Sequence, residues 1–171
     1  MARPTPSLKA RAIGLLAQRE HSRTELRRKL LRIEQQRLRG AAGADGGGLG
    51  SPAEQDDGRV EAAEATVDAL LDALAMDGYL NEARFIESRL HIRAGRFGAQ
   101  RIQQELAQHG LRLDAEQQAN LRATELERAR EVWIKRFGTA PCREPAEQAK
   151  QIRFLMARGF AADIARRVLR T

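Results

Sequence analysis

The sequence has few of the residues that catalytic and metal sites need. Its 171 residues include one cysteine, Cys142, which excludes an internal disulfide and a cysteine-cluster metal site. The three histidines, His21, His91 and His109, have no ligand spacing to one another or to Cys142. No serine or cysteine has a base at a spacing typical of a nucleophile. We therefore expect no catalytic residues, no cofactor, no metal and no enzymatic activity.

Long apolar runs and aromatic residues are also scarce. No run approaches the ~20 apolar residues that span a bilayer, and the N-terminal segment lacks the apolar core and cleavage site of a secretory signal. A free thiol fits a reducing compartment. Aromatic residues are 4% of the chain and much of the 42% hydrophobic share is alanine, which favours several thin cores. We expect a cytoplasmic monomer with no membrane contact.

Charge is distributed along the chain in blocks. Residues 1–40 carry eleven Lys or Arg against three acids (+8), and residues 41–82 carry one against ten (−9). Residues 83–112 return to +4 (six against two), 113–131 to −2 (three against five) and 132–171 to +6 (nine against three). The net charge of +7 indicates a polyanionic or surface-acidic partner. Heavy arginine use by a high-GC genome is the alternative explanation.

Helix signals dominate the sequence and strand signals are nearly absent. Ser22 and Glu25 predict a capping box, and Leu26 and Leu30 follow at helical spacing. A second apolar stripe over 67–74 ends at "DGYL". There Gly78 is expected in the left-handed position, with Tyr79 packing back on the preceding turn. Asn81 is predicted as an N-cap and Asp114 with Gln117 as a second capping box, whereas residues 115–138 could form one bent helix or two.

A degenerate repeat links two of these helical segments. At an offset of 49, three residues of one match three of the other: Leu106, Gly110 and Leu111 correspond to Leu155, Gly159 and Phe160. Each unit is predicted as a short helix ended by a glycine cap and followed by another short helix. Such units cannot bury their apolar faces alone, so they stack in series. We expect an elongated, curved array of helical modules.

The same pattern divides the chain into five parts. Residues 8–39 begin the first repeat, and 40–58 form a flexible, glycine-rich, acidic linker. Residues 59–93 complete the first repeat and enter the second, 94–127 form the central repeat, and 128–171 form the C-terminal repeat. The linker lacks the Gly-Lys-Ser/Thr of a phosphate-binding loop, so no nucleotide site is predicted there.

Four segments resemble, in the same order, the signatures of the RecX regulatory proteins, which are bacterial modulators of the RecA recombinase. They are "REHSRTELRRKL" (19–30), "DGYLNEARF" (77–85), "GAQRIQQEL" (98–106) and "KQIRFLMARGF" (150–160). Asn81 stands where the family usually has Asp, and both residues cap helices. The glycine-rich insertion after the first repeat is longer than is usual in the family.

The resemblance implies an all-α protein of tandem three-helix repeats without catalytic activity. It further implies a partner, the RecA–DNA filament, along whose groove the protein lies. The protein would block filament extension or promote disassembly, and so lower ATP hydrolysis, strand exchange and co-protease activity by RecA. These effects would place it in homologous recombination, DNA repair and the SOS response. Single- or double-stranded DNA would be contacted directly or through the filament.

The candidate binding residues are basic side chains, because the planar guanidinium of arginine engages both carboxylate and phosphate. We expect three basic faces, one in each repeat. They comprise Arg23, Arg27, Arg28 and Arg32, then Arg89, Arg93, Arg96 and Arg101, and finally Lys150, Arg153, Arg158, Arg166 and Arg167. Merely solvated helix faces are the alternative for all three.

A different function is also open at the level of sequence. The chain could be a stand-alone DNA- or RNA-binding regulatory protein, because its short helical units could present a recognition helix. In that case "AQRIQQELAQ" (99–108) would direct four side chains to base edges, those of Arg101, Gln103, Gln104 and Gln108. Phe97 is the aromatic residue least clearly explained by packing, since it lies between Arg96 and Gly98.

Overall fold

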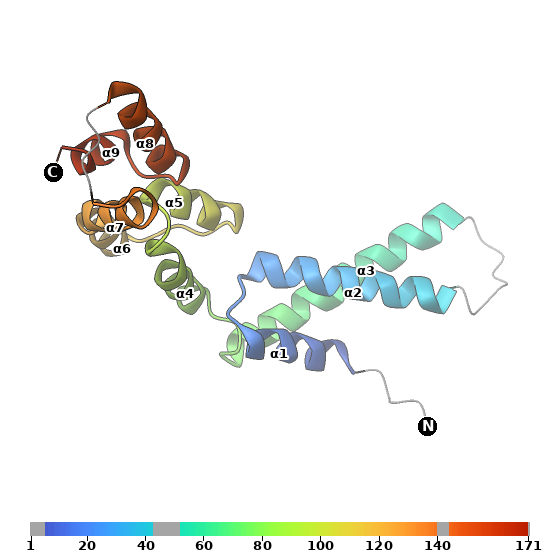
Figure 1. The fold of residues 1–171 in the computed structure, drawn as a ribbon. Coiled ribbons are helices and arrows are strands. Elements are labelled where there is room, and N and C mark those ends of the chain that lie inside the picture. The colour runs from blue at the N-terminus through green and yellow to red at the C-terminus, as the bar shows by residue number, and fades with distance from the viewer. Residues whose placement is uncertain (1–5, 43–51, 140–143, 171) are drawn as a thin grey trace. The chain divides into compact units, whose positions relative to one another are not determined.

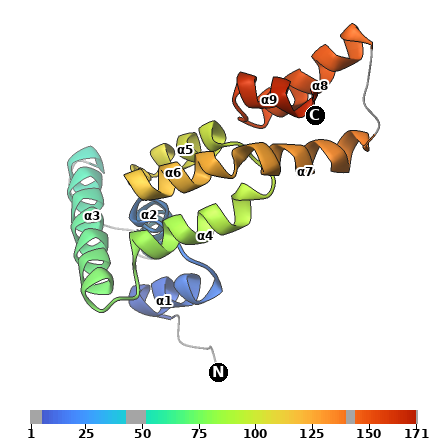
Figure 2. The ribbon, with the colours of Figure 1, turned by 90° about the vertical axis from the view of Figure 1, so that its left-hand side faces the viewer.

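The structure is a computed structural model that describes residues 6–42, 52–139 and 144–170, without the side chains of 41–42 and 52–57. Within these residues the chain forms nine α-helices and no strand (Figures 1 and 2). In chain order they are α1 (Leu8–Gln18), α2 (Arg23–Ala42), α3 (Pro52–Met76), α4 (Glu82–Ala94), α5 (Ala99–Gln108), α6 (Ala115–Ala123), α7 (Glu125–Phe137), α8 (Pro145–Ala157) and α9 (Ala162–Val168). The all-α fold class and its three-helix repeats are confirmed. None of the described helices combines the length and apolarity needed to cross a bilayer.

The chain divides into two compact units, Met1–Phe85 (unit 1) and Ile86–Thr171 (unit 2). In unit 1, α2 and α3 pack side by side, with α1 against α2 (Figures 1 and 2). The core comes from the stripes that the sequence predicts, because residues three and four apart share one face of a helix. Its buried members are Ala12, Leu26, Leu30, Val67, Leu71, Leu74 and Leu80.

The predicted helix ends in unit 1 are largely confirmed. The Glu25 amide donates to Ser22 Oγ at 3.1 Å, and the Arg84 amide donates to Asn81 Oδ1 at 3.0 Å. Gly78 has the expected positive φ of 76°. The packing prediction for Tyr79 is wrong, because its side chain is 48% exposed. Leu80 packs back instead, and its amide donates to the Leu74 carbonyl at 3.1 Å.

Helix occupies both ends of the segment predicted as a linker over 40–58. Helix α2 extends to Ala42 and α3 begins at Pro52, well before the position near Val60 where the apolar periodicity resumes. Proline at the first position of a helix costs no hydrogen bond, because that amide has no partner within the helix. The middle of the predicted linker, residues 43–51, lies outside the described residues.

The core of unit 2 is formed mainly by α7, α8 and α9. Its buried side chains are Ala129, Val132, Trp133, Leu155, Phe160, Ile164, Ala165 and Val168. The Trp133 indole donates to Gln151 Oε1 at 2.7 Å, which satisfies the polar edge of a ring that is otherwise in apolar contact. The segment 115–138 is two helices that meet at Thr124, and the capping box of Asp114 and Gln117 is confirmed.

The predicted repeat corresponds to two copies of one helix-ending motif. Gly110 and Gly159 both have left-handed φ, 75° and 82°. The residue after each glycine donates five residues back, Leu111 to the Leu106 carbonyl at 3.0 Å and Phe160 to the Leu155 carbonyl at 3.2 Å. Each glycine amide also donates three residues back. This is the Schellman motif, so the offset of 49 aligns equivalent ends of α5 and α8.

Candidate functional site

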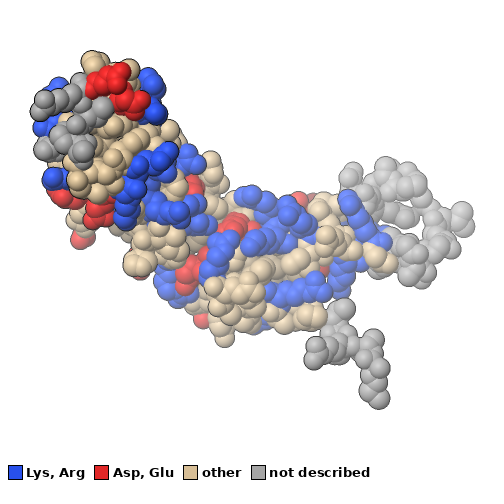
Figure 3. All heavy atoms as spheres, in the orientation of Figure 1, with Lys and Arg blue, Asp and Glu red and all other residues tan. Residues whose placement is uncertain are grey.

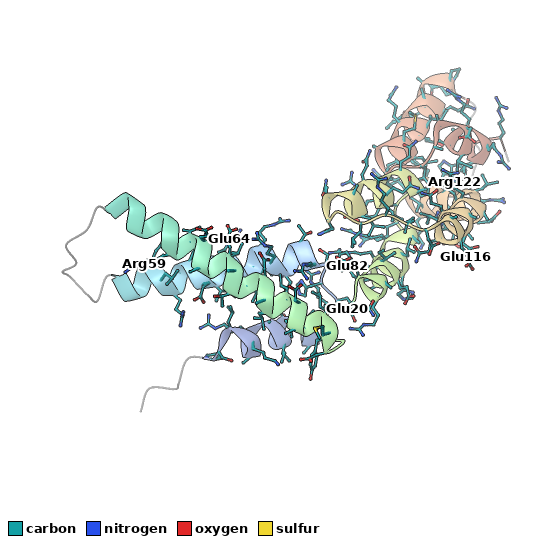
Figure 4. All side chains as sticks on the ribbon, turned by 180° about the vertical axis from the view of Figure 1, so that it is seen from behind. Glu20, Arg59, Glu64, Glu82, Glu116 and Arg122 are labelled. Atoms are coloured by element: carbon teal, nitrogen blue, oxygen red, sulfur yellow. The ribbon has the colours of Figure 1, made fainter. Side chains whose placement is uncertain are left out.

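Two of the four arginines predicted as a binding face in unit 1 form ion pairs with acidic residues of the same unit. Arg23 Nη1 lies 2.7 Å from Asp72 Oδ1. Arg27 Nε lies 2.7 Å from Asp68 Oδ1, and its Nη2 lies 3.0 Å from Glu64 Oε2, which Figure 4 labels on α3. The hydrogen bonds that Arg27 donates to Asp68 and Glu64 raise its pKa above the usual range. These pairs join α2 to α3.

The other two arginines of this face, Arg28 and Arg32, are exposed and lie one turn apart on α2. Neither forms an ion pair with any residue that the structure describes. Their guanidinium groups can therefore meet an external anion without breaking a contact of the fold. The sequence-based prediction grouped all four arginines by their helical spacing. Spacing alone does not show whether an acidic helix packs beside them.

A buried histidine lies at the turn between α1 and α2. His21 Nδ1 is 3.3 Å from Glu25 Oε2, and Glu25 also pairs with Arg19. Burial and the charge of Arg19 lower the pKa of His21, although Glu25 acts in the opposite direction. Burial alone would raise the pKa of Glu25, but the Arg19 hydrogen bond and the charges of His21, Arg19 and Lys29 lower it. These contacts join the turn between α1 and α2 to the first turns of α2.

In unit 2, two of the predicted arginines lie over one aromatic ring. The guanidinium carbons of Arg93 and Arg101 are 5.2 Å and 5.4 Å from the centroid of the half-buried Phe97 ring. Arg93 Nη2 also lies 2.5 Å from Glu105 Oε1. Phe97 is therefore occupied by cation–π contacts, and Arg93 has an acidic partner within the fold. Arg101 is exposed and pairs with no acidic residue that the structure describes.

Two glycines bring the central and C-terminal repeats into backbone contact within unit 2. The Gly98 amide donates to the Arg158 carbonyl at 2.9 Å, and the Gln100 amide donates to the Gly159 carbonyl at 3.2 Å. A Cβ on Gly98 would lie 2.1 Å from the Gly159 oxygen. The start of α5 thus meets the end of α8, an alignment that the helix dipoles favour.

This contact supports a cationic pocket with residues from both repeats. The pocket has a volume of about 270 Å³ and is lined by four basic side chains, two apolar ones and a glycine. They are Arg96, Lys135, Arg136, Arg158, Val132, Phe154 and Gly95. No acidic residue lines the pocket, and none of its four cations pairs with a carboxylate in the described part of the chain. Figure 3 shows Lys and Arg side chains gathered over the region of α5 and α7.

A half-buried arginine and a buried glutamate of α7 fix the segment that carries Arg96. Arg128 donates to the carbonyls of Ala94 and Phe97, both at 2.9 Å, and to the Leu121 carbonyl at 2.7 Å. Burial lowers the pKa of Arg128, against the charge of Glu125. The Glu125 carboxylate, itself buried, accepts from the Ala99 amide at 3.0 Å. No sequence pattern distinguishes either residue, because both are charged residues on a helix.

Two members of the pocket, Lys135 and Arg136, are absent from the residues predicted as binding faces. They lie in the last turn of α7, in "IKRFG", and are exposed. Their position beside a helix-ending glycine was a usable signal, but cations also stabilise a helix C-terminus and so have an ordinary explanation. Only their proximity to Arg96 and Arg158 distinguishes them.

The other predicted residues do not line the pocket. Arg89 is half-buried on α4, and Lys150 on α8 lies 3.4 Å from Glu147 Oε1. The remaining members are exposed on α8 and α9, and they are Arg153, Arg166 and Arg167. Arg158 joins the pocket and stacks on Phe154, with 4.1 Å between its guanidinium carbon and the ring centroid.

These features define an all-α protein of tandem three-helix repeats with cationic surfaces. A family model described as RecX, third three-helix domain, matches residues 123–169, which contain α7, α8 and α9. The Regulatory protein RecX of Leptothrix cholodnii is 45% identical over 170 residues, 98% of this chain and 90% of that protein. Those of Ralstonia pickettii (43%, covering 95% and 86%) and Chromobacterium violaceum (36%, covering 99% and 93%) are similar over nearly the same length. The chain belongs to the RecX family of regulatory proteins.

Proposed function

We propose that this protein is a negative modulator of the RecA recombinase. It binds the RecA–DNA filament, blocks its extension or promotes its disassembly, and so inhibits ATP hydrolysis, strand exchange and co-protease activity. It acts as a monomer in the cytoplasm and catalyses no reaction. Membership of the RecX family is the observation that carries the proposal.

The distribution of unpaired cations supports the same function. Arg28 and Arg32 in unit 1, and Arg96 and Arg101 in unit 2, are exposed and have no acidic partner among the described residues. A nucleoprotein filament presents phosphates and acidic side chains repeatedly along its length. Complementary charge raises the rate at which the protein associates with such a polymer, and it disfavours binding in an incorrect register. A protein bound in this way changes the rates at which subunits add or leave, and the effect weakens as salt rises.

The direct test adds the purified full chain to RecA assembled on single-stranded DNA. We expect ATP hydrolysis to fall at protein concentrations well below that of RecA, and filaments to shorten or stop growing in electron micrographs. Substoichiometric action is expected because one molecule at a filament end blocks many later additions. Unchanged hydrolysis and unchanged filament length at stoichiometric protein would exclude the proposed function.

A charge-reversed variant tests the surface in unit 2. We expect Arg96→Glu with Arg101→Glu to weaken inhibition and to retain wild-type helicity. Arg93 is left intact because reversing it would place a second carboxylate beside Glu105. The matched control reverses two exposed arginines of the same unit, Arg122 and Arg130, which lie outside the pocket. If both variants inhibit RecA equally, the surface around Arg96 and Arg101 does not contact the filament.

A stand-alone DNA- or RNA-binding regulator is the second candidate function. The acid-free pocket in unit 2 favours it, since such a site suits phosphate groups without requiring RecA. The same preparations distinguish the two functions. Tight binding to one duplex sequence, together with unchanged ATP hydrolysis and filament length, would replace the first function with the second.

A further inference from the structure

We propose that the pocket formed by Arg96, Lys135, Arg136 and Arg158 is a phosphate-binding site that holds successive phosphates of a single nucleic-acid strand. The inference deepens the proposed function by naming which groups of the nucleoprotein filament this part of unit 2 binds. The four cations come from three separate segments, the turn after α4, the last turn of α7 and the end of α8. Their convergence is a property of the fold and not of one arginine-rich helix.

The charge balance of the pocket favours phosphates over a protein carboxylate. Four cations line about 270 Å³, and no acidic side chain is among the lining residues. One carboxylate entering this space would leave three like charges facing one another. A nucleic-acid strand brings several anions at regular spacing, and each can take a separate cation. Arginine suits this role because its fork presents parallel donors to phosphate oxygens.

One of the cations is held in position before a ligand binds, and the backbone that carries another is fixed. The Arg158 guanidinium stacks on the Phe154 ring, which itself makes an edge contact with Phe137 at 5.0 Å between centroids. The Arg96 backbone lies within the segment whose carbonyls Arg128 holds. Because the Arg158 guanidinium and the Arg96 backbone are already ordered, binding loses less conformational entropy than it would in a mobile segment. Val132 and Phe154 add an apolar surface on which a sugar or base can rest.

The test uses the full chain, a labelled oligothymidine and no RecA. We expect fluorescence anisotropy to show binding whose logarithm falls linearly with the logarithm of salt concentration between about 50 and 200 mM NaCl. Lys135→Gln with Arg136→Gln should weaken binding on the order of tenfold. It should also reduce the magnitude of the salt slope by about 1.4, since each single-strand phosphate contact contributes about 0.7.

The control replaces two exposed arginines of unit 2 that do not line the pocket, Arg122→Gln with Arg130→Gln. Arg122, labelled in Figure 4, lies in the last turn of α6, so this control also loses a cation at a helix end. Circular dichroism checks that both variants keep their helicity. If the control weakens binding as much as the pocket variant does, or if neither changes the salt slope, the pocket is not the phosphate site.

Two further arms identify the source of the phosphates. In the first arm, millimolar ATP competes with oligothymidine. If ATP displaces oligothymidine from the wild type and does so less in the pocket variant, the pocket binds phosphates and also accepts a free nucleoside triphosphate. A pocket variant that keeps its oligothymidine affinity but loses action on RecA would overturn the proposal in favour of a protein carboxylate. If the wild-type protein binds oligothymidine as expected but does not change RecA activity, the proposed function is excluded and the assignment of the pocket as a phosphate site still holds.

Discussion

Gly98 and Gly159, 61 positions apart in the sequence, meet so closely that neither has room for a side chain. A Cβ on Gly98 would be 2.1 Å from the Gly159 oxygen, and a Cβ on Gly159 would be 2.5 Å from Cβ of Arg101. The contact therefore joins the central and C-terminal repeats through backbone atoms, with two hydrogen bonds rather than apolar side chains. It fixes where the pocket cations of both repeats lie.

Replacing Gly98 with alanine should destabilise unit 2. The added methyl group would lie against the Gly159 carbonyl and the Phe160 amide, and backbone atoms cannot rotate away. We expect a loss of about 3 kcal/mol in the free energy of unfolding, at the upper end of overpacking costs. Trp133, the single and buried tryptophan, reports the transition by fluorescence in urea. Gly95→Ala is the control, since a Cβ there meets nothing within 4 Å; equal losses would show that Gly98 is not closely packed.

Local patterns predicted the helix ends of this protein, whereas contacts distant in sequence decided its site. Ser22, Asn81 and Asp114 cap helices as expected, because capping depends on residues three apart. Nothing near Gly98 in the sequence indicates that Gly159 lies against it. Arg27 looked like any exposed arginine until α3 placed Asp68 beside it.

Arg128→Met should destabilise unit 2 by about 3 kcal/mol. The substitution removes hydrogen bonds from a charged group to the carbonyls of Ala94, Phe97 and Leu121. Carbonyls left unsatisfied within the fold account for most of the loss. Urea unfolding followed by Trp133 fluorescence measures it.

The neighbouring exposed arginine provides the control for this substitution. Arg130→Met should change the free energy of unfolding by less than about 0.5 kcal/mol, as is usual for surface positions. If the two variants unfold at the same urea concentration, the three carbonyl contacts of Arg128 contribute nothing to the stability of the unit.

The stability of unit 1 should decrease as the pH falls below about 6.5. Burial and Arg19 lower the pKa of His21 in the folded state, so the unfolded chain takes up a proton that the folded chain resists. The stabilisation is complete above the ordinary histidine pKa of 6.5 and is lost as the pH falls through the lowered value. Glu25 stays ionised over this range because its own pKa is lowered.

Hydrogen exchange of the α2 amides at several pH values measures this dependence. The slope should not exceed about 1.4 kcal/mol per pH unit, the limit for one proton. His21→Gln removes the titrating group, and the variant should therefore lose the slope between pH 7 and 5 even if it is less stable overall. A slope that persists in the variant would assign the effect to another group.

Arg27 and Arg28, adjacent on α2, should differ in what their replacement changes. Arg27→Gln breaks the pairs with Asp68 and Glu64, which are partly exposed, so we expect a loss of about 0.5–1 kcal/mol that shrinks at high salt. Arg28→Gln breaks no described contact and should leave stability within about 0.5 kcal/mol. Hydrogen exchange of α2 and α3 at two salt concentrations compares them. Equal effects would mean that the acidic face of α3 does not stabilise the unit through Arg27.

The glycine contact also ties recognition to folding in unit 2. Because one wall of the pocket belongs to the central repeat and another to the C-terminal repeat, neither repeat carries the arrangement alone. A relative could keep every cation and still present them at the wrong separation if either glycine were lost. Selection on these two positions would then follow ligand geometry as closely as selection on the arginines themselves, although neither Gly98 nor Gly159 lines the pocket.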